Sequence, residues 1–126
     1  MKNISYKGIA LGVLAILLLD LISGTVLMII FLENMSPEAL DTLYKETTPL
    51  IFAMFFGSIS NIIGGYIAAK YGNTSPYLNS FILGLLGLGF GVLFIDKYPL
   101  WFNAMAFLTV IPTTMLGGYL FARRSV

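Results

Sequence analysis

One carboxyl group lies in the middle of a long apolar stretch near the start of the chain. Asp20 is twelve residues from Gly8 and twelve residues from Leu32, which bound that stretch. A carboxyl group in this position can take up a proton or a cation, and it can also hydrogen-bond between helices. An Asp at the centre of a bilayer costs about 2.5–3.5 kcal/mol. We therefore expect a compensating interaction or a function at Asp20.

Polar side chains at the same depth in the other apolar stretches are the candidate partners of this acid. The predicted layer at the membrane midplane consists of Asp20, Ser23, Asn61, Thr113 and Thr114. In a structural interpretation, Asp20 hydrogen-bonds to Asn61 or to a threonine and fixes the helix register, with about 0.6–2 kcal/mol for each bond. In a functional interpretation, Asp20 binds a proton or a cation during transport. The residue pattern leaves both open.

Few other residues could do chemistry. The chain contains no Cys and no His, which excludes disulfides, thiol redox chemistry and the commonest acid–base side chain. The acids of the polar stretch 33–48 match no metal-ligand spacing; they are Glu33, Glu38, Asp41 and Glu46. Because catalysis needs convergent acid, base or metal groups, we predict no enzyme, no catalytic residue, no metal site and no cofactor.

The composition predicts a membrane protein. The chain is 58% apolar and 10% charged, with a mean hydropathy of +0.90, whereas soluble domains are about 25% charged. A soluble domain of this size could not bury so much apolar surface. The net charge of +1 and the lack of a basic run predict no nucleic-acid partner. The expected surrounding is a lipid bilayer.

Four apolar stretches are each close to the roughly 20 residues that cross a bilayer as a helix. They cover residues 8–32, 50–69, 79–95 and 100–122. Lipid leaves no partner for open strand edges, so we predict an all-α, polytopic protein with one four-helix membrane domain over residues 1–126.

The loops have different predicted characters. Residues 33–48 form an acidic outer loop, and residues 70–78 form a cytoplasmic loop. In the outer loop, Ser36, Pro37 and Glu38 are typical of an N-cap, a first-turn proline and an acid near a helix N-terminus. They predict a short interfacial helix on the outer membrane surface.

The cations are distributed unevenly between the two predicted sides of the membrane. One side carries Lys2, Lys7, Lys70, Arg123 and Arg124, and the other carries Lys45 and Lys97. The positive-inside rule then places both termini in the cytoplasm of a multi-pass protein in a bacterial inner (plasma) membrane.

One short phrase occurs twice, as GGYIAAKYG at 64–72 and as GGYLFARR at 117–124. Both copies end a predicted even-numbered helix at the cytoplasmic face, so the chain is interpreted as two hairpins in a parallel repeat. Small residues allow close approach of helices in lipid. The predicted packing glycines are Gly8, Gly12, Gly57, Gly64, Gly65, Gly84, Gly87, Gly91, Gly117 and Gly118.

On these helix ends, with Gly-Gly-Tyr followed by Ala and a cation, the chain resembles small, uncharacterised four-helix bacterial integral membrane proteins. That resemblance implies the fold and no particular activity. A looser architectural likeness is to the small multidrug resistance transporters, four-helix chains with one acid midway along the first helix, where this chain has Asp20. In that family the acid is a Glu.

The expected function is therefore not enzymatic. We expect a small inner-membrane protein that acts through helix–helix association, either as a homo-oligomer or as a subunit or accessory protein of a membrane assembly, including an immunity-type role. The alternative is a small oligomeric transporter or channel, coupled to protons or cations, that uses Asp20 at the midplane.

Overall fold

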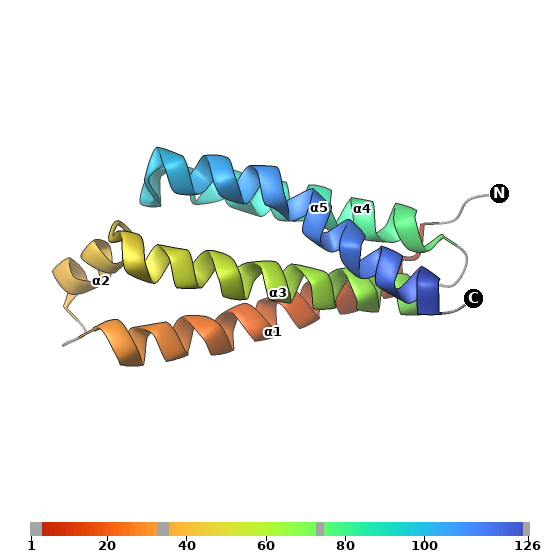
Figure 1. The fold of residues 1–126 in the computed structure, drawn as a ribbon, viewed down its shortest axis with the longest axis horizontal. Helices are drawn as coiled ribbons and strands as arrows, with labels where there is room; N and C mark the ends of the chain where they lie inside the picture. The colour runs from red at the N-terminus through yellow and green to blue at the C-terminus, as the bar shows by residue number, and fades with distance from the viewer. Residues whose placement is uncertain (1–3, 33–35, 73–74, 125–126) are drawn as a thin grey trace.

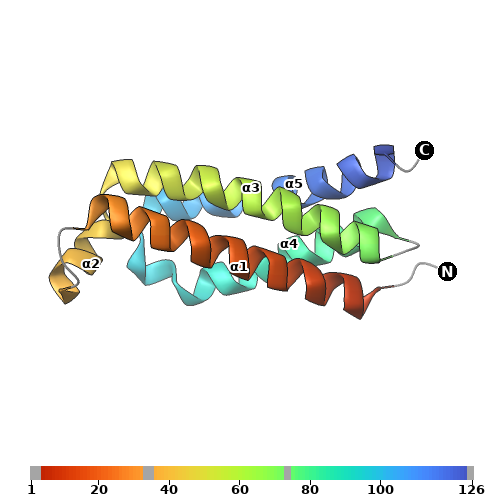
Figure 2. The same ribbon diagram turned by 90° about the horizontal axis from the view of Figure 1, so that it is seen from below.

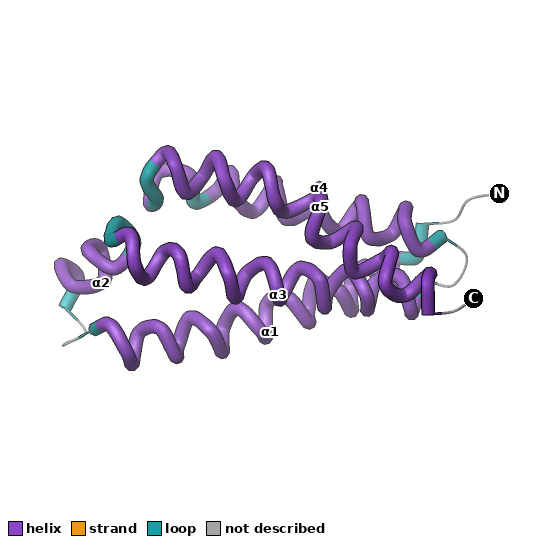
Figure 3. The backbone as a smooth tube through the Cα atoms, viewed as in Figure 1, coloured by secondary structure: helices purple, strands orange, loops and turns teal. Residues whose placement is uncertain are grey.

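The computed structural model describes residues 4–32, 36–72 and 75–124, so Lys2 and Glu33 of the predictions above lie outside the described residues. These ranges are almost entirely helical and contain no strand (Figure 3). The elements are α1 (Tyr6–Phe31), α2 (Pro37–Leu43), α3 (Thr47–Tyr71), α4 (Pro76–Leu93), the 3-10 helix η1 (Ile95–Lys97) and α5 (Leu100–Arg124). Helices α1, α3, α4 and α5 are long and apolar enough to cross a membrane. The prediction of an all-α protein with four candidate spans is confirmed.

The start of the short helix α2 follows the predicted capping chemistry. The Ser36 side chain accepts a hydrogen bond from the Ala39 N–H at 3.1 Å. Pro37 occupies the first turn, where its missing N–H costs nothing. Glu38 lies in the same turn, where a negative charge is favourable. Helix α1 begins in the same way, because Ser5 accepts from the Gly8 N–H at 3.0 Å.

The helices form two hairpins, α1 with α3 and α4 with α5, that meet closely at one end and diverge toward the other. Helix α3 packs against α1, α4 and α5, and α4 packs along α5. Helix α1 begins and α5 ends at the same end of the bundle, which we call the narrow end; α2 and η1 lie at the opposite, wide end (Figures 1 and 2). Helix α5 bends part-way along its length (Figure 1) and contains Pro112, which removes one helical hydrogen bond.

Glycines bring α3 and α5 into backbone contact near the narrow end. A Cβ atom added at Gly65 would overlap the Thr114 carbonyl group, and a Cβ atom added at Gly117 would overlap the carbonyl oxygen of Ile62. The two Gly-Gly-Tyr segments therefore lie directly against one another, where α5 crosses α3. Close backbone approach of this kind is how helices associate in lipid.

Most of the other predicted packing glycines also lie at helix contacts. Gly8, Gly12 and Gly64 lie between α1 and α3, and Gly84, Gly87, Gly91 and Gly118 lie between α4 and α5. Gly57 differs, because no atom lies within 4 Å of the position that its Cβ would take. It lines a cavity instead of a helix contact.

Two buried polar side chains also join the helices at the narrow end. The Asn79 side chain is 0% exposed. It accepts a hydrogen bond from the Ser5 N–H at 2.8 Å and donates to the Ser75 carbonyl at 2.9 Å. The Ser80 hydroxyl donates to the Gly65 carbonyl of α3 at 2.9 Å. The sequence analysis did not single out these residues, because depth in an apolar stretch does not reveal long-range partners.

Candidate functional site

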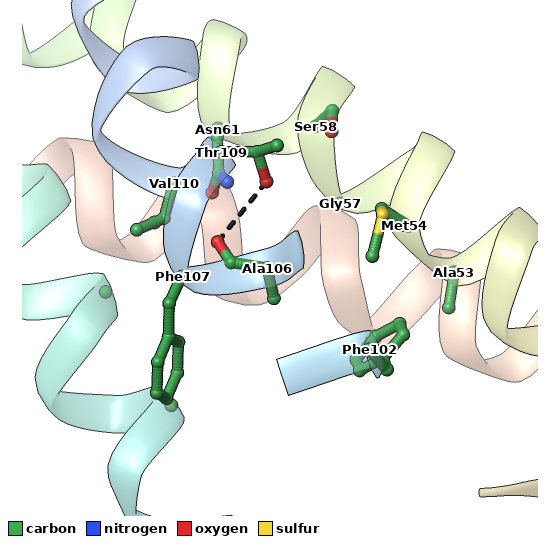
Figure 4. A pocket seen from close by; sticks show the side chains of 12 residues that line it. Ala53, Met54, Gly57, Ser58, Asn61, Phe102, Ala106, Phe107, Thr109 and Val110 are labelled. Atoms are coloured by element: carbon green, nitrogen blue, oxygen red, sulfur yellow. Dashed lines mark hydrogen bonds between the residues drawn. The ribbon is translucent and has the colours of Figure 1, made fainter. Parts of the chain in front are cut away.

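A half-open groove separates the two hairpins in the wide half of the bundle. Its main cavity, about 150 Å³, lies between α3, α4 and α5 (Figure 4). Ser58 and Asn61 line it from α3, and Phe102, Phe107 and Thr109 line it from α5. The groove exists because α3 and α5 touch at their glycines near the narrow end and then diverge.

Two further cavities continue the groove in opposite directions. A cavity of about 140 Å³ lies toward the wide end, beneath α2, and shares Ala53 with the main cavity. A cavity of about 50 Å³ lies toward the narrow end and shares Asn61 with the main cavity. The three cavities adjoin one another from α2 to just past Asn61, and together they are called the groove.

Asp20 lies on the face of α1 that borders this groove. Its neighbours one turn away are Gly24, which lines the cavity beneath α2, and Ile16, which lines the small cavity. Residues four apart lie on one face of a helix. The Asp20 side chain is exposed in the single chain. It therefore lies at the open edge of the groove.

The side chain of α3 that interacts with the Asp20 carboxyl group is Ser60. Its hydroxyl donates to the Phe56 carbonyl at 3.0 Å. A hydroxyl has one hydrogen and two acceptor lone pairs. While it donates to Phe56, Ser60 can receive a hydrogen bond from a protonated Asp20; to donate to an ionised Asp20, it must release Phe56. The pair is therefore sensitive to the proton on Asp20.

The other residues of the predicted polar layer do not form one network. The Ser23 hydroxyl donates to the backbone carbonyl of Asp20 at 3.2 Å. The Thr113 hydroxyl donates to the Thr109 carbonyl at 2.7 Å, and the Thr114 hydroxyl donates to the Ile111 carbonyl at 3.0 Å, both within α5. Thr114 is fully buried against α3 and α4. Within the described ranges, no side-chain bond joins Asp20 to Asn61 or to these threonines.

Asn61 has an unusual position among these residues. It lines both the main and the small cavity, and in the part of the chain that the structure describes its amide has no hydrogen-bond partner. In Figure 4 the amide points toward the Thr109 hydroxyl and the Ala106 carbonyl on the opposite wall. These two groups are joined by a 3.3 Å hydrogen bond. Polar groups of α3 and α5 thus converge on the inner part of the groove.

Aromatic side chains border the wide end of the groove. The Tyr44 and Tyr98 rings meet edge to face with centroids 5.4 Å apart, and the Phe102 ring stacks on Tyr98 at 4.7 Å. The Lys97 ammonium lies 5.5 Å from the centroid of the Tyr44 ring, a cation–π contact. This cluster joins α2 to the start of α5. The residue pattern does not reveal this cluster, because Tyr44 and Tyr98 are far apart along the chain.

Tyr98 in this cluster is half-buried. Burial raises the pKa of the Tyr98 hydroxyl above its ordinary value, and the charges of Tyr44 and Asp20 raise it further. The hydroxyl therefore keeps its proton and remains a hydrogen-bond donor. Asn103 positions the turn, because its amide donates to the Ile95 carbonyl at 2.8 Å and to the Tyr98 carbonyl at 3.3 Å.

The described acids of the outer loop, Glu38, Asp41 and Glu46, do not gather into a metal site. In residues 4–32, 36–72 and 75–124, no group of three or more acidic, His or Cys side chains is placed to hold a metal ion. Asp41 forms an exposed ion pair with Lys45 at 3.5 Å. Such exposed pairs contribute little to stability.

Comparison with known proteins yields no relative. No protein-family model matches the chain, and no curated protein or solved structure matches it significantly.

Proposed function

We propose that this protein acts in a membrane by associating with other membrane-spanning helices, as a homo-oligomer or as a subunit or accessory protein, including an immunity-type one. The observation that carries the proposal is the exposed Asp20 at the open edge of the groove. The exposed neighbours of Asp20 on α1 include Leu17, Leu18 and Leu21. An ionisable group that faces lipid at this depth is costly. A second chain packed over the groove would separate Asp20 from lipid.

The proposed orientation follows from charge. Within the described residues, the narrow end carries four cations, Lys7, Lys70, Arg123 and Arg124. The wide end carries two, Lys45 just after α2 and Lys97 at the end of η1. By the positive-inside rule, the narrow end and both termini face the cytoplasm of a bacterial inner membrane, and α2 lies on the outer surface. In this proposal the two hairpins are a parallel repeat related by an axis along the membrane normal.

Native mass spectrometry of the protein extracted gently from its host membrane tests the association. We expect a discrete dimer or larger homo-oligomer, or a complex with a second membrane protein. Asp20→Leu should weaken a complex that shields the carboxyl group, whereas Asp96→Leu in η1 should leave its mass unchanged. A monomer in every mild detergent and in lipid nanodiscs would contradict the proposal.

A second candidate function is the transport of protons or monovalent cations through such an oligomer. The Asp20–Ser60 pair favours it, because the hydrogen bond at Ser60 depends on the proton that Asp20 carries. Repeated copies of Asp20 could border one shared pathway, which a single four-helix chain is too small to enclose.

Flux measurements in liposomes test the second function. With a pH gradient across the membrane, the wild-type oligomer should move protons, and Asp20→Asn should abolish this flux while it inserts and assembles normally. Asp96→Asn makes the same chemical change at an exposed acid outside the groove and should leave the flux unchanged. Equal flux in wild type and Asp20→Asn would exclude a transport role for Asp20.

A further inference from the structure

The inner part of the groove contains a polar group that the protein itself does not satisfy. In the described residues, the Asn61 amide has no hydrogen-bond partner and lines two cavities at mid-depth. An amide without a hydrogen bond in an apolar medium costs several kcal/mol, and lipid chains offer no donor or acceptor. Whatever occupies the space beside Asn61 must therefore be polar.

Most of the wall of the main cavity is apolar, and its polar groups lie at the level of Asn61, where they can hold water. Its volume of about 150 Å³ exceeds the roughly 10–15 Å³ that a single water molecule needs. A buried water needs two to four polar partners. On the wall opposite the Asn61 amide, the Thr109 hydroxyl donates to the Ala106 carbonyl within α5 (Figure 4). A water molecule among them would satisfy the Asn61 amide.

Toward the narrow end the groove ends just past Asn61, after the small cavity, and toward the wide end it is open. Toward the narrow end, the backbones of α3 and α5 touch at Gly65 and Gly117, and no space remains between them. Toward the wide end, the main cavity adjoins the cavity beneath α2 and Tyr98, and Ala53 lines both. The contact at the glycines therefore separates the groove from the narrow end.

We propose that the groove is an aqueous vestibule that opens at the wide end beside α2. Water fills it as far as Asn61 and along the edge where Asp20 lies. The glycine contact between α3 and α5 closes the vestibule toward the narrow end. This inference rests on the proposed association, because a partner chain must keep lipid out of the open edge of the groove. It holds whether or not Asp20 carries a transported ion.

Cysteine accessibility tests this proposal directly, because the chain contains no Cys. Single variants Asn61→Cys and Gly57→Cys place a thiol in the groove, and the space beside Gly57 is open. Ile59→Cys on α3 and Leu108→Cys on α5 are the matched controls, because both positions are exposed to lipid. A charged, membrane-impermeant methanethiosulfonate reacts with thiolates, which form where a cysteine is in contact with water. The reagent is applied to one side of sealed vesicles of known orientation.

We expect Asn61→Cys and Gly57→Cys to react when the reagent is on the wide-end side, within about 100-fold of the rate of Thr42→Cys on exposed α2. The lipid-facing controls should not react, and reagent on the narrow-end side should label neither groove position. Unreactive thiols at both groove positions would show a dry groove, and equal labelling from both sides would show that the glycine contact does not close it. Either result would overturn the proposal.

The thermal stability of each variant is measured first, so that only folded variants count. The oligomeric state is measured on the same samples. A dry groove in an oligomer would refute the vestibule alone, and a wet groove in a monomer would refute the association alone.

Discussion

The backbone contact between Gly65 and α5 can be tested with a single methyl group. Gly65→Ala would place the new Cβ over the Thr114 carbonyl oxygen, 2.7 Å from the carbonyl carbon and 2.9 Å from the Cα atom. All three atoms belong to the backbone, so no side chain can rotate away. Carbon atoms in ordinary contact are about 3.5–4.0 Å apart. Helices α3 and α5 would have to separate by roughly 1 Å.

This separation has a predictable cost. Overpacking of a tight contact destabilises proteins by about 1–3 kcal/mol, and occasionally by more. The shift also strains the hydrogen bond from the Ser80 hydroxyl to the Gly65 carbonyl, which is 2.9 Å long; bonds between helices in lipid contribute about 0.6–2 kcal/mol. We therefore expect Gly65→Ala to lower the free energy of unfolding by about 2–4 kcal/mol.

Gly57→Ala is the matched control, because it makes the same change on the same helix in open space. It should be neutral, or stabilise by up to about 1 kcal/mol through helix propensity. Reversible unfolding in lipid bicelles, followed by steric trapping, measures both variants. If Gly65→Ala were within about 0.5 kcal/mol of Gly57→Ala, which is the usual range of surface substitutions, the α3–α5 contact described here would be wrong.

Two further predictions concern the narrow end and the aromatic cluster. Asn79→Ala should lower the unfolding free energy by about 1–3 kcal/mol in the same assay, because it removes the acceptor of the partly buried Ser5 N–H; the Ser75 carbonyl keeps its hydrogen bond from the backbone N–H of residue 79. Asn61→Ala, which breaks no bond in the described chain, should cost clearly less, and equal losses would count against this role of Asn79. Burial raises the pKa of Tyr98. The contribution of its neutral hydroxyl to the unfolding free energy is therefore complete below the ordinary tyrosine pKa of about 10, and it is lost as the pH rises through the raised pKa. Ultraviolet titration should show that Tyr98→Phe removes a late-ionising tyrosine, and an unchanged titration curve would refute this.

Several features followed directly from the residue pattern. The lengths of the apolar stretches predicted four helices, because only a helix satisfies its own backbone in lipid. The capping residues Ser36, Pro37 and Glu38 predicted the start of α2, because caps depend on neighbours within one turn. The paired glycines at Gly64 and Gly117 indicated close packing, and both lie at helix contacts.

The sequence by itself predicted the level of each polar residue along its helix, and the tertiary structure decided what that residue faces. Depth is read by counting along a helix, and it placed Asp20 and Asn61 at one level. Their contacts depend on how each helix is rotated about its axis, which packing against neighbouring helices sets. That rotation brings Ser60 to Asp20 and leaves the Asn61 amide facing a cavity. It also turns Gly57 toward open space, although it shares its small-residue spacing with Gly65.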